Sequence, residues 1–264
     1  MGVSVESNVR GSCCLCGANA VVLTGEHKVK ASALKKEFGN RPLYIGNVEH
    51  GPMRYAQGTK SKAFHFNSKL CADCNSSRTQ GADRAFDKFN SNATQLCAEG
   101  APPEFAFMDE AFLEGTPGYV DLFRYFAKIL CCHIADLDGP RLLHMCNFAI
   151  GKNNQNCVYL SVDLDPKYKK YVHSGSYGPY AAHGGLVVYS DGETGGPNAF
   201  HSTLTIGPVR YVFYSRLTWL ERLEVRLGHM KFYDWCRQMS AEAKRNPISS
   251  EDRLDLGLNS GDDA

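Results

Sequence analysis

The 264-residue sequence contains no run of apolar residues that approaches the roughly 18 needed for a membrane-spanning helix. Its first residues lack the basic start and the apolar stretch of a secretory signal. The Gly-rich segment at residues 173–185 does not close on Lys-Ser or Lys-Thr, so it fits no phosphate-binding template and we expect an ordinary connection there. These absences disfavour membrane and secreted proteins, and we expect a cytoplasmic protein with no membrane contact.

The cysteine content argues against a disulfide scaffold. Such scaffolds are small secreted chains with an even number of cysteines, whereas this long chain has 11. Several cysteines are scattered, and we expect them to be small buried hydrophobic residues in a reducing compartment. They are Cys97, Cys131, Cys132, Cys146, Cys157 and Cys236.

Four other cysteines are spaced as two pairs. Cys13 and Cys16 form one Cys-x2-Cys pair, and Cys71 and Cys74 form the second. Four thiolates from two such pairs are the closed tetrahedral ligand set of a structural zinc ion. We therefore expect a structural Zn²⁺ at these residues, with Cys14 pointing away from it.

The net charge of +1 hides an uneven distribution of charged residues. Residues 1–90 carry 13 basic and 7 acidic side chains, whereas the remainder carries 16 basic and 21 acidic ones. A basic part that holds the paired cysteines, joined to an acidic part, is typical of a nucleic-acid-binding module next to a regulatory or specificity module. An ordinary solvated surface is the alternative interpretation of the same charges.

The spacing of apolar residues predicts both helices and strands along the chain. Early on, "ANAVVLTGEH" predicts a strand that ends at His27, "SALKKEFG" a short helix that ends at Gly39, and the segment after Cys74 a longer helix. Further along, residues 119–137 predict a buried helix and "HSTLTIGPVRYVFYS" predicts two paired strands. The segment that starts at Trp219 returns to a helical pattern.

The stretch "EGAPPEF", residues 99–105, is the best candidate for a linker, because its two consecutive prolines cannot continue a helix. The tail of the chain is acidic and polar, which is typical of a disordered segment. We expect a first domain over residues 1–98, a second domain over residues 99–246, and a disordered tail over residues 247–264.

Three stretches of the first part, "CCLCG", "TGEHKVKASAL" and "LCADCNSSRTQGAD", together resemble the HNH endonucleases. The resemblance lies in their order: a cysteine knuckle, a strand with an acidic residue and a histidine, and a second knuckle that runs into an asparagine. It covers about residues 1–90. It implies an α+β protein in which an N-terminal zinc-braced ββα-metal (HNH, treble-clef) domain is followed by a mixed α+β domain.

The resemblance also implies roles for individual residues. It makes His27 the general base that activates water, while Glu26 and Asn75 hold one catalytic Mg²⁺ or Mn²⁺ ion. Histidine suits proton transfer near neutral pH, and oxygen ligands suit a hard cation. Asn67 is the nearest candidate for the middle asparagine, which orients the base, and Arg78 is placed to clamp the scissile phosphate. Many members have Asp and His where this chain has Glu26 and Asn75.

Together these observations predict a metal-dependent endonuclease that hydrolyses phosphodiester bonds in DNA, with anti-phage defence or restriction as a reasonable setting. The second domain would then select the target, a protein partner or an activating ligand. A first alternative is a zinc-dependent module that binds DNA or protein without catalysis. A second alternative is an enzyme with its active site in the second half, which a deep pocket lined by His173, His183 and His201 would favour.

Overall fold

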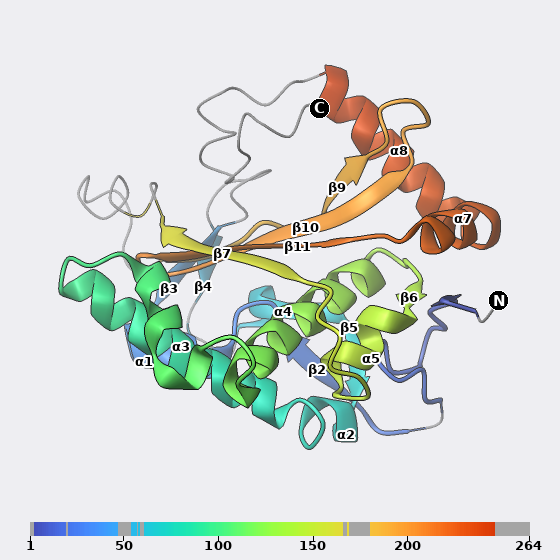
Figure 1. Cartoon of the computed structure of the whole chain (residues 1–264). Coiled ribbons are helices and arrows are strands. Elements are labelled where there is room, and N and C mark those ends of the chain that lie inside the picture. Colours follow the sequence, from blue (N-terminus) through green and yellow to red (C-terminus); the bar gives the residue numbers. More distant parts are fainter. Residues whose placement is uncertain are drawn as a thin grey trace.

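The computed structural model describes residues 3–19, 21–46, 54–56, 58, 61–165, 168 and 180–245. Within these ranges the chain is a mixed α+β protein, as the sequence predicts (Figure 1). The expected acidic tail, residues 247–264, lies outside them. None of the helices in these ranges combines the length and the apolar character needed to cross a membrane.

A seven-stranded sheet runs through the middle of the molecule (Figure 1). Its strands follow the order β4-β3-β8-β10-β11-β7, with β9 also paired to β10. Neighbouring strands are antiparallel except β3 and β8, which are parallel. The strands are β3 (Leu43–Gly46), β4 (Arg54–Ala56), β7 (Tyr159–Leu164), β8 (Tyr180–His183), β9 (Val187–Ser190), β10 (Pro197–Ile206) and β11 (Val209–Arg216).

The strands β10 and β11 are the pair that the sequence predicts. Ile206 lies opposite Val209, and the turn between them contains Gly207 in the left-handed conformation, with φ of +58°. Glycine adopts this conformation without the steric cost that other residues incur. A local signal in the sequence is therefore sufficient to specify this hairpin.

Helices gather mainly below the sheet and at one end of it (Figure 1). They are α1 (Ala31–Phe38), α2 (Ala72–Asn75), α3 (Gln80–Ala98), α4 (Pro117–Asp136), α5 (Leu143–Ala149), α7 (Trp219–Gly228) and α8 (Met230–Arg245), with 3₁₀ turns η1 (Lys62–Phe64), η2 (Pro103–Met108) and η3 (Glu110–Phe112). The single helix expected from Trp219 is in fact two. The chain breaks at His229, whose backbone angles (φ −131°, ψ 49°) leave the helical region.

The core lies between α3, α4 and the strand β11. Phe86 of α3 stacks on Tyr125 of α4, with ring centroids 4.0 Å apart. The hydroxyl of Tyr211 in β11 donates a 2.8 Å hydrogen bond to Asn90 of α3, so this buried polar group has a partner. Because side chains alternate along a strand, Tyr211 and Phe213 point into this core while Val212 between them faces the opposite side of the sheet.

Two shorter strand pairs complete the fold. β2 (Leu23–His27) is antiparallel to β5 (His65–Cys71), and β1 (Val5–Glu6) is antiparallel to β6 (Arg141–Leu142). The strand expected before His27 is therefore present, although it begins only at Leu23. The β2–β5 pair and the helices α2 and α3 that follow it carry most of the residues that the sequence singles out.

The two halves of the chain share one hydrophobic core. Residues before and after position 99 belong to a single cluster of buried side chains, and β3 and β4 from the first half are strands of the central sheet. The stretch at residues 99–105 does not act as a linker, since Pro103 begins the 3₁₀ turn η2 and is buried. The boundary expected between residues 98 and 99 therefore does not divide the structure into two cores.

Candidate functional site

Four thiols meet where the cysteine spacing predicts. The Sγ atoms of Cys13, Cys16, Cys71 and Cys74 all lie within 4.8 Å of one another, and those of Cys16 and Cys71 are 3.7 Å apart. Thiolates about 2.3 Å from a tetrahedral zinc ion lie about 3.8 Å from each other, so the group has the dimensions of a zinc site. The four cysteines could therefore hold a metal ion, and Zn²⁺ is the ion that this donor set favours.

The first knuckle is anchored to the second half of the chain. Gly17 has a left-handed backbone (φ +74°), and a side chain there would collide with Arg141 of β6. The guanidinium of Arg141 donates a 2.7 Å hydrogen bond to the carbonyl of Leu15. Cys14 points away from the other thiols, as expected, and its Sγ lies 3.9 Å from that of Cys132 in α4. The metal site is thus built against β6 and α4 rather than standing alone.

Glu26 points from β2 into the interior, where it meets a buried lysine. Its Oε1 lies 3.1 Å from Nζ of Lys128 in α4, and the same ammonium lies 2.7 Å from Oδ1 of Asp83 in α3. The Lys128 side chain is only 1% exposed. Burial raises the pKa of Glu26, and the charge of Lys128 opposes that change. These three residues form one interior ion cluster that joins β2 to both long helices.

The Lys128→Met substitution tests this cluster. Removal of one partner from a buried ion pair leaves an uncompensated charge and typically costs about 3–5 kcal/mol. We expect a loss of this size in the free energy of unfolding, measured by urea denaturation at pH 7. Lys128→Met combined with Glu26→Gln should recover part of the loss, because the buried carboxylate is then replaced by a neutral amide. A single variant as stable as the wild type would contradict the assignment.

His27 lies on the other side of β2 and pairs with a histidine that the sequence analysis did not single out. It is the register partner of His65 in β5, and their ring centroids are 3.9 Å apart. Burial lowers the pKa of His27 to about 4, and the neighbouring charges of His65 and Lys128 add to this effect. Burial also lowers the pKa of His65. Both rings are therefore neutral at pH 7, and His27 can accept a proton.

Asn75 supports the strand that carries these residues. Its side-chain amide donates a 2.8 Å hydrogen bond to Oγ1 of Thr24 and a 3.1 Å hydrogen bond to the carbonyl of Gly25. Because the carbonyl can only accept, the NH₂ group must face β2, and the amide oxygen is directed away from these bonds. Glu26 and Asn75, the expected ligands of one catalytic cation, thus have different partners in the structure.

The two remaining expected site residues lie at the surface. Asn67 is exposed on β5, in the irregular stretch between the register pairs of His27 and Gly25. Arg78 lies in the turn between α2 and α3, where its guanidinium pairs with the carboxylate of Asp73. These positions do not assign Asn67 or Arg78 to catalysis. The residue paired with His27 across the two strands is His65 and not Asn67.

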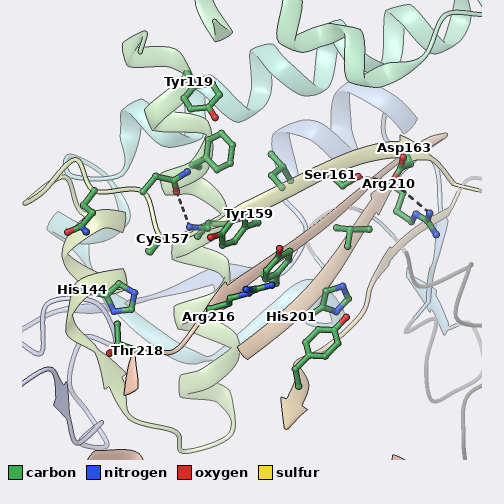
Figure 2. Close-up of a pocket in the computed structure, with 18 of the residues that line it drawn as sticks. Tyr119, His144, Cys157, Tyr159, Ser161, Asp163, His201, Arg210, Arg216 and Thr218 are labelled. Carbon is green, nitrogen blue, oxygen red and sulfur yellow. Dashed lines mark hydrogen bonds and ion pairs between the residues drawn. The ribbon is translucent and has the colours of Figure 1, made fainter. Parts of the chain in front are cut away.

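A groove in the second half bears on the alternative of a separate active site. It has a volume of about 1330 Å³, lies along β7 and β11, and has His201 among its lining residues (Figure 2). His183 is not among them; its ring centroid lies 6.1 Å from that of His133. His173 falls outside the described ranges. Of the two expected histidines that the structure describes, His201 lines this groove and His183 does not.

Sequence reasoning missed two residues of the β2–β5 site, His65 and Lys128. The alternation in "AFHFNSKL" puts His65, Asn67 and Lys69 on one face of a strand, and this signal could have placed His65 beside the predicted base. Lys128 stands within an apolar helical stretch, which indicates a buried ion pair but does not name its partner. That partner is known only from the packing of α4 against β2.

Comparison of the chain with protein-family models, with curated proteins and with solved structures gives no match.

Proposed function

We propose that this protein is an HNH-type endonuclease that hydrolyses phosphodiester bonds in DNA, with His27 as the general base. The observation that carries the proposal is the position of His27, a neutral and partly exposed histidine at one end of the β2–β5 strand pair. The four clustered thiols lie at the other end of this pair. A zinc knuckle gives rigidity to this small β-sheet, and a rigid support is what a positioned base requires. The basic surplus of residues 1–90 suits a polyanionic substrate.

His27 would act on a water molecule beside the phosphate. The water transfers a proton to the imidazole, its oxygen attacks phosphorus, and one P–O ester bond breaks. The leaving oxygen takes a proton from solvent water to give an alcohol and a phosphate monoester, and the imidazolium then returns its proton to solvent. A low pKa keeps the ring unprotonated at neutral pH. Arrival of an anionic phosphate raises that pKa, because a nearby negative charge favours the protonated imidazole. Substrate binding itself therefore strengthens the base.

Glu26 and Asn75, the expected ligands of Mg²⁺ or Mn²⁺, already have other partners in the structure. A cation on Glu26 would have to displace the ammonium of Lys128, which already pairs with that carboxylate. Asn75 offers its amide oxygen, but its amide nitrogen is committed to β2. We therefore assign no step of the reaction to these two residues, and the dependence on a divalent ion is left to experiment.

The test is cleavage of supercoiled plasmid by the wild type and by His27→Ala, with Mg²⁺, with Mn²⁺ and without added ion. Loss of a general base typically lowers the rate by about 10²–10⁴-fold, and we expect a loss in this range. His229→Ala, which removes a partly buried histidine from the break between α7 and α8, serves as the matched control and should cleave normally. Equal cleavage by the wild type and His27→Ala would reject the assignment of the base.

A non-catalytic zinc module is a second candidate, because the carboxylate of Glu26, an expected metal ligand, is already paired with Lys128. This candidate predicts no cleavage under any of these conditions. It also predicts that His27→Ala binds DNA as tightly as the wild type in a gel-shift assay. Cleavage that depends on His27 would exclude it.

A further inference from the structure

The groove along β7 and β11 is lined by aromatic, cationic and neutral polar side chains. Its volume of about 1330 Å³ is larger than the roughly 300–1,000 Å³ of pockets for drug-sized ligands. Figure 2 shows Tyr159 and Arg216 on one side of His201, and Ser161 and Asp163 further along β7. Alternation along β11 directs Val212, Tyr214 and Arg216 into the groove from the sheet face opposite the α3–α4 core. The groove also extends past the edge strand β7 to Tyr119 and Phe123 of α4. None of these residues belongs to the β2–β5 site.

Two tyrosines and an arginine lie together in the lining of the groove, and we call these three residues the platform. Tyr159 of β7 and Tyr214 of β11 are register partners, and their rings stack with centroids 4.7 Å apart and an angle of 11° between their planes. The guanidinium carbon of Arg216 lies 6.0 Å from the centroid of Tyr159 and 5.9 Å from that of Tyr214. Tyr159 is 53% exposed. The platform thus presents a π-face and a cation to solvent.

Arg216 contributes charge that is not already neutralised. No carboxylate forms an ion pair with it in the part of the chain that the structure describes, whereas His144 at the same groove is paired with Glu221. A guanidinium in this setting binds phosphate through several N–H groups. The groove therefore suits an anion that also carries aromatic rings.

His201, which also lines the groove, is a buried polar side chain. It is 2% exposed, and within the described ranges neither of its ring nitrogens is hydrogen-bonded. Burial lowers its pKa to about 4, with a further contribution from the charge of Arg210, so the ring is neutral. A neutral imidazole offers one donor and one acceptor. Since an unsatisfied buried polar group is costly, a ligand with hydroxyl or base-edge groups would complete this site.

We propose that this groove binds a short single-stranded oligonucleotide, with bases on Tyr159 and Tyr214 of the platform, a phosphodiester at Arg216, and a hydroxyl or base edge at His201. Stacking on aromatic side chains together with a cationic groove is the general means by which proteins hold unpaired nucleic acid. Two sources share this chemistry: an unpaired stretch of the nucleic acid on which the protein acts, and a free oligonucleotide.

Binding is measured by fluorescence anisotropy with a labelled single strand of about eight nucleotides. The His27→Ala variant is used without added divalent ion, so that the result is independent of cleavage and of the proposed nuclease function. Loss of one stacking contact should weaken binding about fivefold or more in Tyr159→Ala. Tyr159→Phe keeps the ring and should bind like its parent. Arg216→Ala should also weaken binding and reduce its salt dependence.

Competition separates the two sources of the ligand. Full competition by an unlabelled strand of about four nucleotides supports a free oligonucleotide. Competition only by longer strands, or by a duplex with an unpaired tail, supports a stretch of substrate. The proposal is overturned if the parent protein shows no saturable binding, if blunt duplex competes as well as single strand, or if Tyr159→Ala binds unchanged while circular dichroism and zinc content match the parent.

Discussion

Cys74→Ser is expected to prevent stable folding of the whole chain, not only of the β2–β5 pair. Structural zinc in small domains contributes about 10–16 kcal/mol of apparent binding free energy, which is as large as the total stability of a typical domain at about 5–15 kcal/mol. The effect should spread because the knuckle is anchored by Arg141 of β6 and lies against α4. We expect little soluble protein, less than stoichiometric zinc, and loss of the near-ultraviolet circular dichroism signal.

Cys97→Ser is the matched control for this substitution. Cys97 is a partly buried cysteine in α3 that does not belong to the four-thiol group. It should retain one zinc per chain by elemental analysis and a thermal unfolding midpoint close to that of the wild type. If Cys74→Ser instead folds as well as Cys97→Ser, the four thiols are not a structural metal site.

Acid is expected to destabilise the protein as the pH falls from about 6.5 to about 4, a loss that begins well above the pKa values of ordinary carboxylates. Burial lowers the pKa of His201 and of His183 to about 4, and lowers that of His133 as well. In the unfolded chain these side chains take up protons near pH 6.5. The unfolded state therefore binds more protons throughout this window, and stability must fall as the pH is lowered. His201 alone accounts for about 3 kcal/mol.

Urea denaturation at several pH values in this window measures the effect, with zinc content followed in parallel because acid also protonates thiolate ligands. His201→Leu should show a shallower dependence of unfolding free energy on pH, since one buried titrating group is gone. Glu26 acts in the opposite direction, because its pKa is raised in the folded state and its protonation favours folding at low pH. A flat profile for the wild type would mean that these histidines are solvated or charged in solution.

Several features of this protein follow from the sequence alone because they depend on short-range patterns. Two Cys-x2-Cys pairs specify a four-thiol site, since each knuckle is a local turn with its own geometry. Helical spacing of apolar residues identifies α4, which begins at Pro117 and whose N-cap residue Thr116 accepts a hydrogen bond from the Tyr119 amide. The β10–β11 hairpin is likewise predicted by a short-range pattern, namely two runs of strand-forming residues separated by a turn at Gly207. The strand that ends at His27 is likewise predicted by its own residues.

The partners of those elements were decided only by tertiary structure. Nothing in the local sequence pairs Glu26 with Lys128 or adds β3 and β4 to the central sheet. The groove likewise needs β7 and β11 side by side, although Tyr159 and Tyr214 are far apart in the chain. Helix and turn formation depends on residues within a few positions of each other. Ion pairs, register and cavities depend on which buried surfaces meet, and that choice is made by the packing of the whole core.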